Sequence, residues 1–462
     1  MTAGTTDANA ASPEREGDVP RTLFEPGAMP FWIAVVLTGV AAGVGAALLT
    51  ALLMKVQDLS WGASDPAALT EAARRAAPGR HVLLLLAAGL LTGAGGWLLA
   101  RFVPGGETDI TEAIWFRAGR LPTIKTLGSA ALSTVIVAMG AALGREGAPK
   151  HAGAAFGNLA SGLQKLSDEQ RRLLVAIGAG AGMAAVYSVP LGGALFALEV
   201  VRGQLALRLL LPALTATTIA TKVAMFVIPD APIYTVPVYH VGLADFAFAA
   251  LAAPIIGLWS VAFVRLIAWA DRSRPSGWRR ILAPFLVFAA VGLVSIPLPQ
   301  VLGNGQDVAQ ELFRQPLPLF ALLVLVPVRP LCTVASVASG APGGLFTPSL
   351  SAGALMGAAL GVLWLHIDPQ GDLSLYAIIC AGAMLAATTQ GPISSLVMMM
   401  ELTGHARFFT LPMLVAIIIA TAIARTIEPR SIYEARLSDQ QVAERFRVRG
   451  ARPTPARPRR AI

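Results

Sequence analysis

Charged residues are scarce in this chain of 462 residues, because Asp, Glu, Lys and Arg make up only 14% of it. A soluble domain carries about 25%. There are only two cysteines, Cys332 and Cys380, and the five histidines show no metal-ligand spacing. No stretch alternates apolar and polar residues over the ~10 positions of a membrane β-strand. These absences argue against a soluble domain, a disulfide framework, a bound metal and a β-barrel, and we expect no cofactor.

Apolar residues make up 55% of the chain and gather in long runs. A helix of about 20 residues crosses the roughly 30 Å hydrocarbon core of a bilayer. The sequence therefore predicts an all-α polytopic membrane protein. Its long helices are expected at 29–54, 80–102, 121–143, 206–228, 244–270, 280–298, 316–338 and 407–426.

Shorter helices, interrupted by glycine, are expected between the long ones. Broken helices are tolerated at membrane depth only where they line a cavity or are buried in protein. They indicate a transport path rather than a passive anchor. The expected ranges are 109–117, 146–163, 172–187, 191–202, 344–364, 373–387 and 391–403.

An internal repeat divides the chain into halves at about 29–228 and 244–426. Small-residue packing motifs produce single matches by coincidence, but here two matches occur in the same order, which favours a duplication. Two related halves with a site at their interface are a common transporter plan. At an offset of 200, Gly144, Ala152, Gly153, Ala154 and Gly157 recur as Gly344, Ala352, Gly353, Ala354 and Gly357. At an offset of 202, Pro190 and Glu199 recur as Pro392 and Glu401.

The ends of the chain are polar. Residues 1–28 predict a disordered tail, residues 29–437 a transmembrane domain, and residues 438–462 a basic tail rich in arginine. Such a tail suits nucleic acid or anionic lipid, but in a membrane protein the excess of basic residues on the cytoplasmic side explains it better. We therefore expect no nucleic-acid partner, and both termini in the cytoplasm.

Glu146 is the most informative residue of the chain. It stands in Gly144-Arg145-Glu146-Gly147, inside the apolar part of the sequence. An ionisable group at membrane depth is costly and normally faces a bundle interior or a water-filled path. Beside accessible glycine amides, its carboxylate can fill the place of an anion and so act as a gate. The alternative is a structural carboxylate that is paired with Arg145.

Three glycine-rich breaks precede or open helical stretches, at 104–109, 144–149 and 339–348. Helix N-termini present unpaired N–H groups and a partial positive charge, which suit an anion. Several such ends aimed at one point would bind chloride without a fixed cation. A full cation would hold the anion too tightly for fast passage.

These segments carry a resemblance to a known family. GREG at 144–147, SGAPGGLFTP at 339–348 and Ser431-Ile432-Tyr433 resemble the CLC family of chloride channels and chloride/proton exchangers. The resemblance implies a CLC-type inverted repeat of many tilted and broken helices, packed as a homodimer with one pore per subunit. It implies chloride or another small anion as the transported ligand, and a multi-pass protein of the lipid bilayer. Without a C-terminal regulatory module, the chain resembles prokaryotic members, so we expect the bacterial inner membrane.

The resemblance also implies roles for single residues. Glu146 falls on the gating glutamate, the amides of Leu345 and Phe346 fall on backbone donors, and Tyr433 falls on a tyrosine whose hydroxyl helps to hold the central anion. In the implied mechanism, the deprotonated Glu146 carboxylate occupies an anion site and the protonated one swings away. Tyr433 also fits an aromatic residue at the membrane interface.

The anion site implied by the resemblance extends to both sides of the gate. Gly147 and Ala148 would lend amides near the outer site, with Arg145 beside them. At the first break the family usually reads GSGIP, and its serine contacts the anion. Here Gly105 stands at that position, followed by Gly106. The missing hydroxyl weakens the expectation of strict chloride selectivity.

A second departure concerns proton coupling. Exchangers of the family usually carry an internal proton-transfer glutamate as the second residue of a Glu-Glu pair, and here the pair reads Glu199-Val200. Valine cannot relay a proton, which favours an uncoupled or weakly coupled anion channel. We interpret Glu199 and Glu401 as structural, satisfying buried helix ends or pairing with a residue such as Arg329.

Two other functions stay open. The first is a chloride/proton antiporter that uses a different internal relay, such as water or Glu199. The second is an intramembrane enzyme or a lipid-binding scaffold. An enzyme would need a nucleophile–base pair or metal ligands at membrane depth, and the sequence offers no such pairing, so we expect that the protein is not an enzyme.

Overall fold

The computed structural model describes residues 19–20, 25, 27–63, 65–106, 108–315, 317–405 and 409–448. This part of the chain is built of helices and connecting loops, without a β-strand. The all-α fold predicted from the sequence is therefore confirmed. The predicted N-terminal tail (1–28) and basic C-terminal tail (438–462) lie for the most part outside the described residues.

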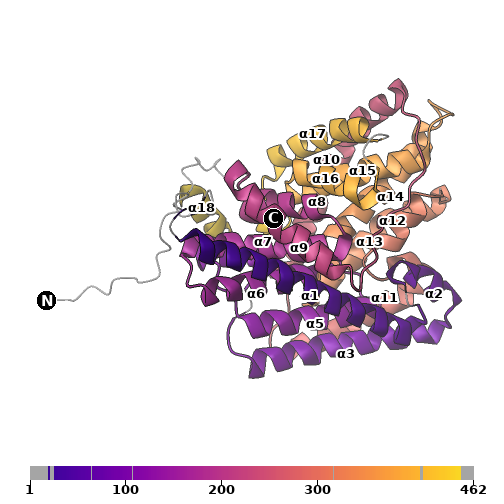
Figure 1. Cartoon of the computed structure of the whole chain (residues 1–462). Coiled ribbons are helices and arrows are strands. Elements are labelled where there is room, and N and C mark those ends of the chain that lie inside the picture. Colours follow the sequence, from indigo (N-terminus) through magenta and orange to yellow (C-terminus); the bar gives the residue numbers. More distant parts are fainter. Residues whose placement is uncertain are drawn as a thin grey trace.

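The described residues of the first half form nine α-helices, which Figure 1 shows in place. They are α1 (Ala28–Trp61), α2 (Leu69–Arg75), α3 (Pro78–Phe102), α4 (Ile110–Phe116), α5 (Thr123–Ala138), α6 (Gly147–Leu163), α7 (Asp168–Tyr187), α8 (Pro190–Phe196) and α9 (Leu207–Ala224). A 3-10 turn, η2 (Pro66–Ala68), precedes α2, and a π-helical turn, η3 (Ala197–Arg202), continues α8.

The second half also contributes nine α-helices within the described residues. They are α10 (Leu243–Arg272), α11 (Arg279–Ser295), α12 (Gln306–Leu312), α13 (Leu319–Ala338), α14 (Phe346–Trp364), α15 (Leu373–Thr389), α16 (Pro392–Thr403), α17 (Thr410–Ile427) and α18 (Asp439–Val448). Two 3-10 turns, η4 (Pro299–Val301) and η5 (Glu434–Arg436), lie before α12 and α18. Each helical range expected from the sequence contains a helix, whereas the short α2 and α12, and α18 within the expected C-terminal tail, were not predicted.

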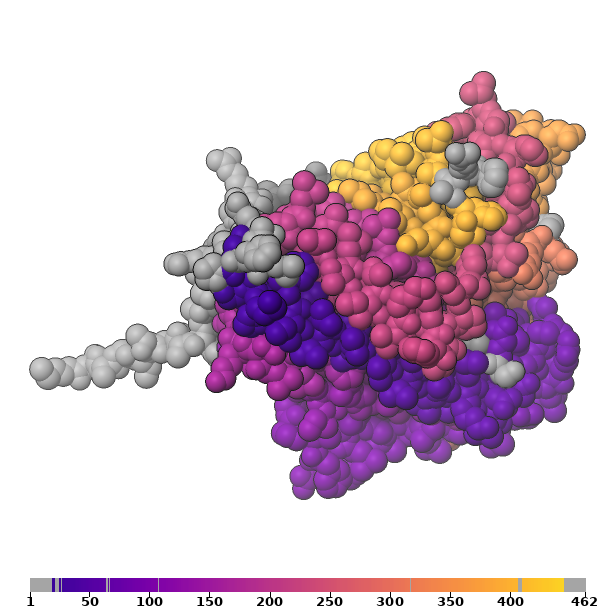
Figure 2. Space-filling model, in the orientation of Figure 1, coloured from indigo at the N-terminus to yellow at the C-terminus, as the bar shows by residue number. Residues whose placement is uncertain are grey.

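Seven helices of the described part are long and apolar enough to cross a membrane: α1, α3, α9, α10, α13, α14 and α17. They differ in how much of their apolar window is buried, from 28% in α3 to 78% in α14. A helix buried on all sides can be apolar throughout because it meets only protein, while α3 exposes the same kind of residues. The protein therefore has central helices surrounded by a lipid-facing shell, and α1 and α9 lie side by side on one face of that shell (Figure 2).

Close helix packing in the centre depends on glycine. A Cβ atom on Gly153 of α6 would collide with the carbonyl oxygen of Gly178 in α7. In the second half, a Cβ on Gly357 of α14 would lie 2.6 Å from the carbonyl oxygen of Tyr376 in α15. Small residues let two helix backbones approach where no hydrophobic effect drives helix association. The α6–α7 and α14–α15 pairs are thus built alike, as the sequence repeat predicts.

The two halves also exchange equivalent contacts. The Glu199 carboxylate accepts hydrogen bonds from the amides of Ile393 and Ser394 in the first turn of α16, at 3.2 and 2.6 Å. The Glu401 carboxylate accepts hydrogen bonds from the first turn of α8 in the same way, from Leu191 and Gly192. Each glutamate therefore caps a helix of the other half. Of the two structural roles predicted for these glutamates, this is the one in which they satisfy buried helix ends.

Arg329 takes no part in these caps. Its guanidinium donates to the carbonyl oxygens of Gln300 and Gly303 and to the Ser351 hydroxyl. The suggested pairing of Arg329 with Glu199 or Glu401 is wrong, because backbone acceptors already satisfy this buried cation.

Candidate functional site

The two loops that carry the GREG and GGLF segments are joined by backbone hydrogen bonds. The Gly144 amide donates to the Gly344 carbonyl oxygen and the Gly344 amide donates to the Gly144 carbonyl oxygen, both at 2.8 Å. Directly after this bridge, α6 begins at Gly147 and α14 begins at Phe346. The N-termini of two helices, one from each half, are thereby brought to one point. Such an arrangement favours a negative charge between them.

The Glu146 carboxylate occupies this point. Oε1 accepts a hydrogen bond of 2.7 Å from the Phe346 amide, and Oε2 accepts from the hydroxyls of Tyr187 (3.0 Å) and Thr347 (3.1 Å). The two hydroxyls also lie 2.6 Å from each other. Glu146 is only 1% exposed. A carboxylate from one half thus lies on the helix terminus of the other, where its charge is balanced by donors rather than by a cation.

Space for this carboxylate exists because two neighbouring residues are glycine. A Cβ atom on Gly144 or on Gly344 would overlap the carboxylate oxygens of Glu146. Neither glycine needs an unusual backbone conformation, since neither has a positive φ. Their identity is required by the closeness of the carboxylate.

Arg145 does not pair with Glu146. Its guanidinium carbon lies 5.2 Å from the centre of the Tyr187 ring, in the range of a cation–π contact. The interpretation of Glu146 as the partner of Arg145 is therefore wrong. Gly147 and Ala148 form the first turn of α6, and no side chain caps that helix. Pro149 follows them, so the amides that this turn presents come from Gly147 and Ala148.

Tyr433 is buried close to the same helix starts. It is 6% exposed, and its ring lies 6.0 Å from that of Phe196, which in turn lies 6.5 Å from the ring of Phe346. Its other neighbour is Lys150, whose ammonium nitrogen lies 4.1 Å from the ring centre. Tyr433 thus belongs to the interior cluster and not to an interfacial belt.

The first glycine-rich break is arranged differently. The Asp109 side chain accepts a hydrogen bond of 2.8 Å from the Thr111 amide and so caps α4 with a residue of its own loop. Gly105 is exposed, has φ +103°, and its carbonyl oxygen accepts from the Lys125 ammonium at 2.6 Å. The structure therefore places Gly105 at the surface end of the loop, while Gly106 lines the cavity described next.

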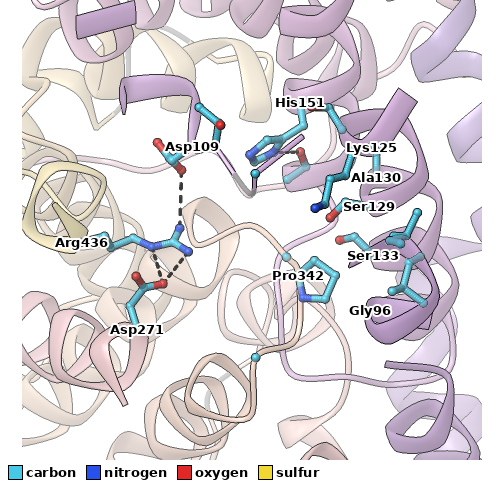
Figure 3. Close-up of a pocket in the computed structure, with 18 of the residues that line it drawn as sticks. Gly96, Asp109, Lys125, Ser129, Ala130, Ser133, His151, Asp271, Pro342 and Arg436 are labelled. Carbon is cyan, nitrogen blue, oxygen red and sulfur yellow. Dashed lines mark hydrogen bonds and ion pairs between the residues drawn. The ribbon is translucent and has the colours of Figure 1, made fainter. Parts of the chain in front are cut away.

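A cavity of about 360 Å³ lies between α3, α5, the start of α6, the end of α10 and η5 (Figure 3). Arg436 lies along one side of it, donating to Asp271 at 2.9 Å through Nε and lying 4.0 Å from Asp109. On the opposite wall are small and polar side chains of α5. Residues that line the cavity include Gly96, Gly106, Thr108, Asp109, Lys125, Ser129, Ser133, Gly147, Ala148, His151, Asp271, Pro342 and Arg436. The cavity therefore leads from the first break to the start of α6.

Val200 stands next to Glu199 in the π-helical turn η3. Such turns occur often at functional sites. The Val200 side chain is buried and faces the start of α16, since a Cβ on Gly391 would lie 2.5 Å from Val200 Cγ2. An apolar, packed side chain therefore stands at the position where the exchangers of the resemblance carry their proton-transfer glutamate.

Three residues of the site were missed by the sequence reasoning. Tyr187 ends a helix of glycine and alanine, and no sequence signal distinguishes it. Thr347 lies inside the quoted GGLFTP segment, but only the amides before it were considered. Lys150 could have been found, because the argument that singled out a buried charge at Glu146 applies to it as well.

Comparison with known proteins decides the family. The profile of the Voltage gated chloride channel family matches residues 88–425. The chain belongs to the voltage-gated chloride channel family. Two relatives are both named voltage-gated ClC-type chloride channel ClcB. The Salmonella typhi protein is 32% identical over 408 residues, 85% of this chain and 96% of the relative. The protein of Escherichia coli O81 (strain ED1a) is 33% identical over 387 residues, 80% and 90% of the two chains.

Solved structures of the family share the fold. A slow cyanobacterial Cl⁻/H⁺ antiporter superimposes with a TM-score of 0.77 at 23% identity, covering 91% of this chain and 99% of that chain. A CLC-type fluoride/proton antiporter gives 0.68 at 20% identity, covering 88% and 98%. The predicted CLC-type inverted repeat is confirmed by this likeness.

Proposed function

We propose that this protein moves chloride or another small anion across a bacterial inner membrane, through a path that Glu146 opens and closes. The observation that carries the proposal is the 2.7 Å hydrogen bond from the Phe346 amide to Glu146 Oε1. An amide at a helix N-terminus suits an anion of any kind. A carboxylate bound there is in the place of a small anion, so the two compete.

The mechanism follows from that competition. Deprotonated Glu146 fills the site and blocks passage. Protonation removes the charge that the Phe346 amide and the two hydroxyls stabilise, and the side chain then leaves the site to an anion. The anion is held by the amides of Leu345 and Phe346, by those of Gly147 and Ala148 beyond the gate, and by the Tyr433 hydroxyl.

The cavity supplies access from one side. It reaches Gly147 and Ala148 from the loop of Gly105 and Gly106. Arg145 lies apart from that cavity and lines a smaller hollow beside α1. We propose that Arg145 does not contact the anion directly. Its positive charge attracts anions to the side of the gate that the cavity does not reach. In the cell the protein is a homodimer with both termini in the cytoplasm.

Val200 favours passage without proton exchange. Glu199 is the alternative acid next to Val200 in the chain, but both of its oxygens are engaged by the first turn of α16. A channel, or a weakly coupled transporter, is therefore the form of the proposal that we prefer. The second candidate is a chloride/proton antiporter with another relay, and it is favoured by the chain of hydroxyls from Tyr187 and Thr347 to Glu146.

The test uses purified protein in tight liposomes loaded with chloride, with the external pH followed as chloride runs out. Chloride efflux without proton movement supports the channel. Uphill proton movement that an uncoupler abolishes establishes the antiporter. If no chloride leaves, nitrate and fluoride are tried next, and failure of all three anions overturns the proposal.

A further inference from the structure

Lys150 brings a basic side chain into the interior of the protein, in the first turns of α6. The residue is only 7% exposed. Within the part of the chain that the structure describes, its ammonium group makes no hydrogen bond and no ion pair within 4.0 Å. The ammonium instead lies over the face of the Tyr433 ring, 4.1 Å from its centre. A cation–π contact offsets part of the loss of hydration, but it leaves the three N–H donors of the ammonium free.

The acids near Lys150 are committed elsewhere. The charges that act on it are those of Asp109, Arg436 and Glu146. Asp109 caps the Thr111 amide and faces Arg436, so it does not serve as a partner for the lysine. Glu146 is held by the Phe346 amide and two hydroxyls. Lys150 therefore lies electrostatically between the cavity and the gate, without a counter-ion of its own.

A buried charge that lacks a partner is strongly destabilising. A mobile anion removes that cost, and the surroundings suit one. Gly147, Ala148 and His151, all within one turn of Lys150, line the cavity, so an anion entering there reaches the start of α6, the helix that carries Lys150. We propose that Lys150 is a ligand of a small monovalent anion, held between its ammonium group and the Tyr433 hydroxyl. This inference rests on the proposed function, since the anion is the transported one.

The assignment changes the expected behaviour of the path. The ammonium of Lys150 is a charged donor and therefore a stronger ligand for an anion than a neutral hydroxyl. A fixed cation lengthens the stay of each anion, because binding must be weak for fast passage. The protein should therefore bind chloride tightly and pass it slowly.

The test is calorimetric titration of chloride into the detergent-purified full chain. Lys150→Met should weaken chloride binding by about tenfold or more, because a charge-assisted contact is lost. Lys150→Arg should stay within about threefold of wild type, since the charge remains. The matched control is Lys125→Met, which removes one positive charge from the wall of the cavity, from a lysine that is bonded to a backbone carbonyl. Unchanged affinity in Lys150→Met, or an equal loss in Lys125→Met, overturns the inference.

A second measurement needs no variant and covers the case in which Lys150→Met does not fold. Crystals of the wild-type protein soaked in bromide should show an anomalous peak within hydrogen-bond distance of Lys150 Nζ, about 3 to 3.5 Å. Peaks confined to other places overturn the inference. The proposed function fails separately, if wild-type liposomes pass no anion while the titration still shows binding that depends on Lys150.

Discussion

Two kinds of glutamate bridge the halves of this molecule, and they differ in symmetry. Glu199 and Glu401 form a reciprocal pair, in which each caps a helix of the opposite half. Glu146 caps α14 by accepting a hydrogen bond from the Phe346 amide. Phe346 itself stands at the position equivalent to Glu146 in the second half, and its side chain has no group that could cap α6 in return. A two-fold relation between halves generates reciprocal contacts. The contact without a counterpart is the one that the repeat does not explain.

The difference separates what builds the fold from what works in it. The pair at Glu199 and Glu401 supports both helix starts equally, so neither carboxylate can leave without exposing amides. At Glu146 the equivalent position is apolar, and the carboxylate competes with an anion for the amide that it caps. The following variants test this contrast, from the largest expected effect to the smallest.

Gly344→Ala should have the largest effect. The new methyl group would overlap Glu146 Oε1 and lie 2.8 Å from the Gly147 amide nitrogen. Overpacking of this kind costs about 1–3 kcal/mol of stability, which thermal unfolding in detergent will measure. Gly162→Ala in α6 is the control, because a Cβ there meets nothing within 4 Å. The double variant Glu146→Ala/Gly344→Ala should recover part of the loss, and no recovery would contradict the account of the glycine.

Glu146→Gln should open the path. Hydrogen bonds to a charged group are worth about 1.5–3 kcal/mol. A neutral glutamine accepts a weaker hydrogen bond from the Phe346 amide, so an anion displaces it more easily. Chloride flux at neutral pH should rise by about tenfold or more, and its dependence on pH should disappear. Liposome efflux between pH 4 and 8 measures both, and an unchanged profile would rule out the gate.

Glu199→Gln and Glu401→Gln should reduce stability to the same extent. Each removes a charge from a helix N-terminus and should cost about 1–2 kcal/mol. Unfolding curves of the two variants should coincide, and the pH dependence of flux should match that of wild type. A change of pH dependence in only one of them would break the symmetry between the pair.

Tyr187→Phe should have the smallest effect. It removes one of the three donors to Glu146 and leaves the Phe346 amide and the Thr347 hydroxyl in place. A hydrogen bond to a carboxylate is worth about 1.5–3 kcal/mol, but the Thr347 hydroxyl stays on the same oxygen and offsets part of the loss, so a net loss of about 1 kcal/mol and a roughly three- to sixfold increase in flux are expected. Tyr376→Phe in α15 is the control, since it removes a buried hydroxyl that does not touch Glu146. Equal changes in both variants would argue against a specific role of Tyr187.

Much of the fold could be predicted from the sequence, because apolar runs and glycine breaks are local signals. The helices near 29–54 and 344–364 and the repeat were found in this way. The partners of the helix ends could not be found, since Glu199 and Ser394 meet only when the two halves are assembled. The identity of Arg329's acceptors likewise depends on a loop between 300 and 303 that has no motif.

The candidate site was predicted in part. Glu146, Gly147 and Phe346 follow from the motifs and lie together in the structure. Gly105 was placed by its position in a motif, but its loop is exposed and the start of α4 is already capped by Asp109. Aspartate is a preferred N-cap residue that bonds an amide two or three positions later. Asp109 and Thr111 therefore already indicated in the sequence that the start of α4 is capped by its own loop.

The bridge between Gly144 and Gly344 limits how the protein can move. Many transporters built from repeats rock one half against the other to expose a central site alternately. Here both halves are tied by two backbone hydrogen bonds directly beside the gate, and a rocking movement would break both at once. Opening by rotation of the Glu146 side chain leaves both hydrogen bonds intact, so the gate can work without the microsecond or slower movement of whole domains.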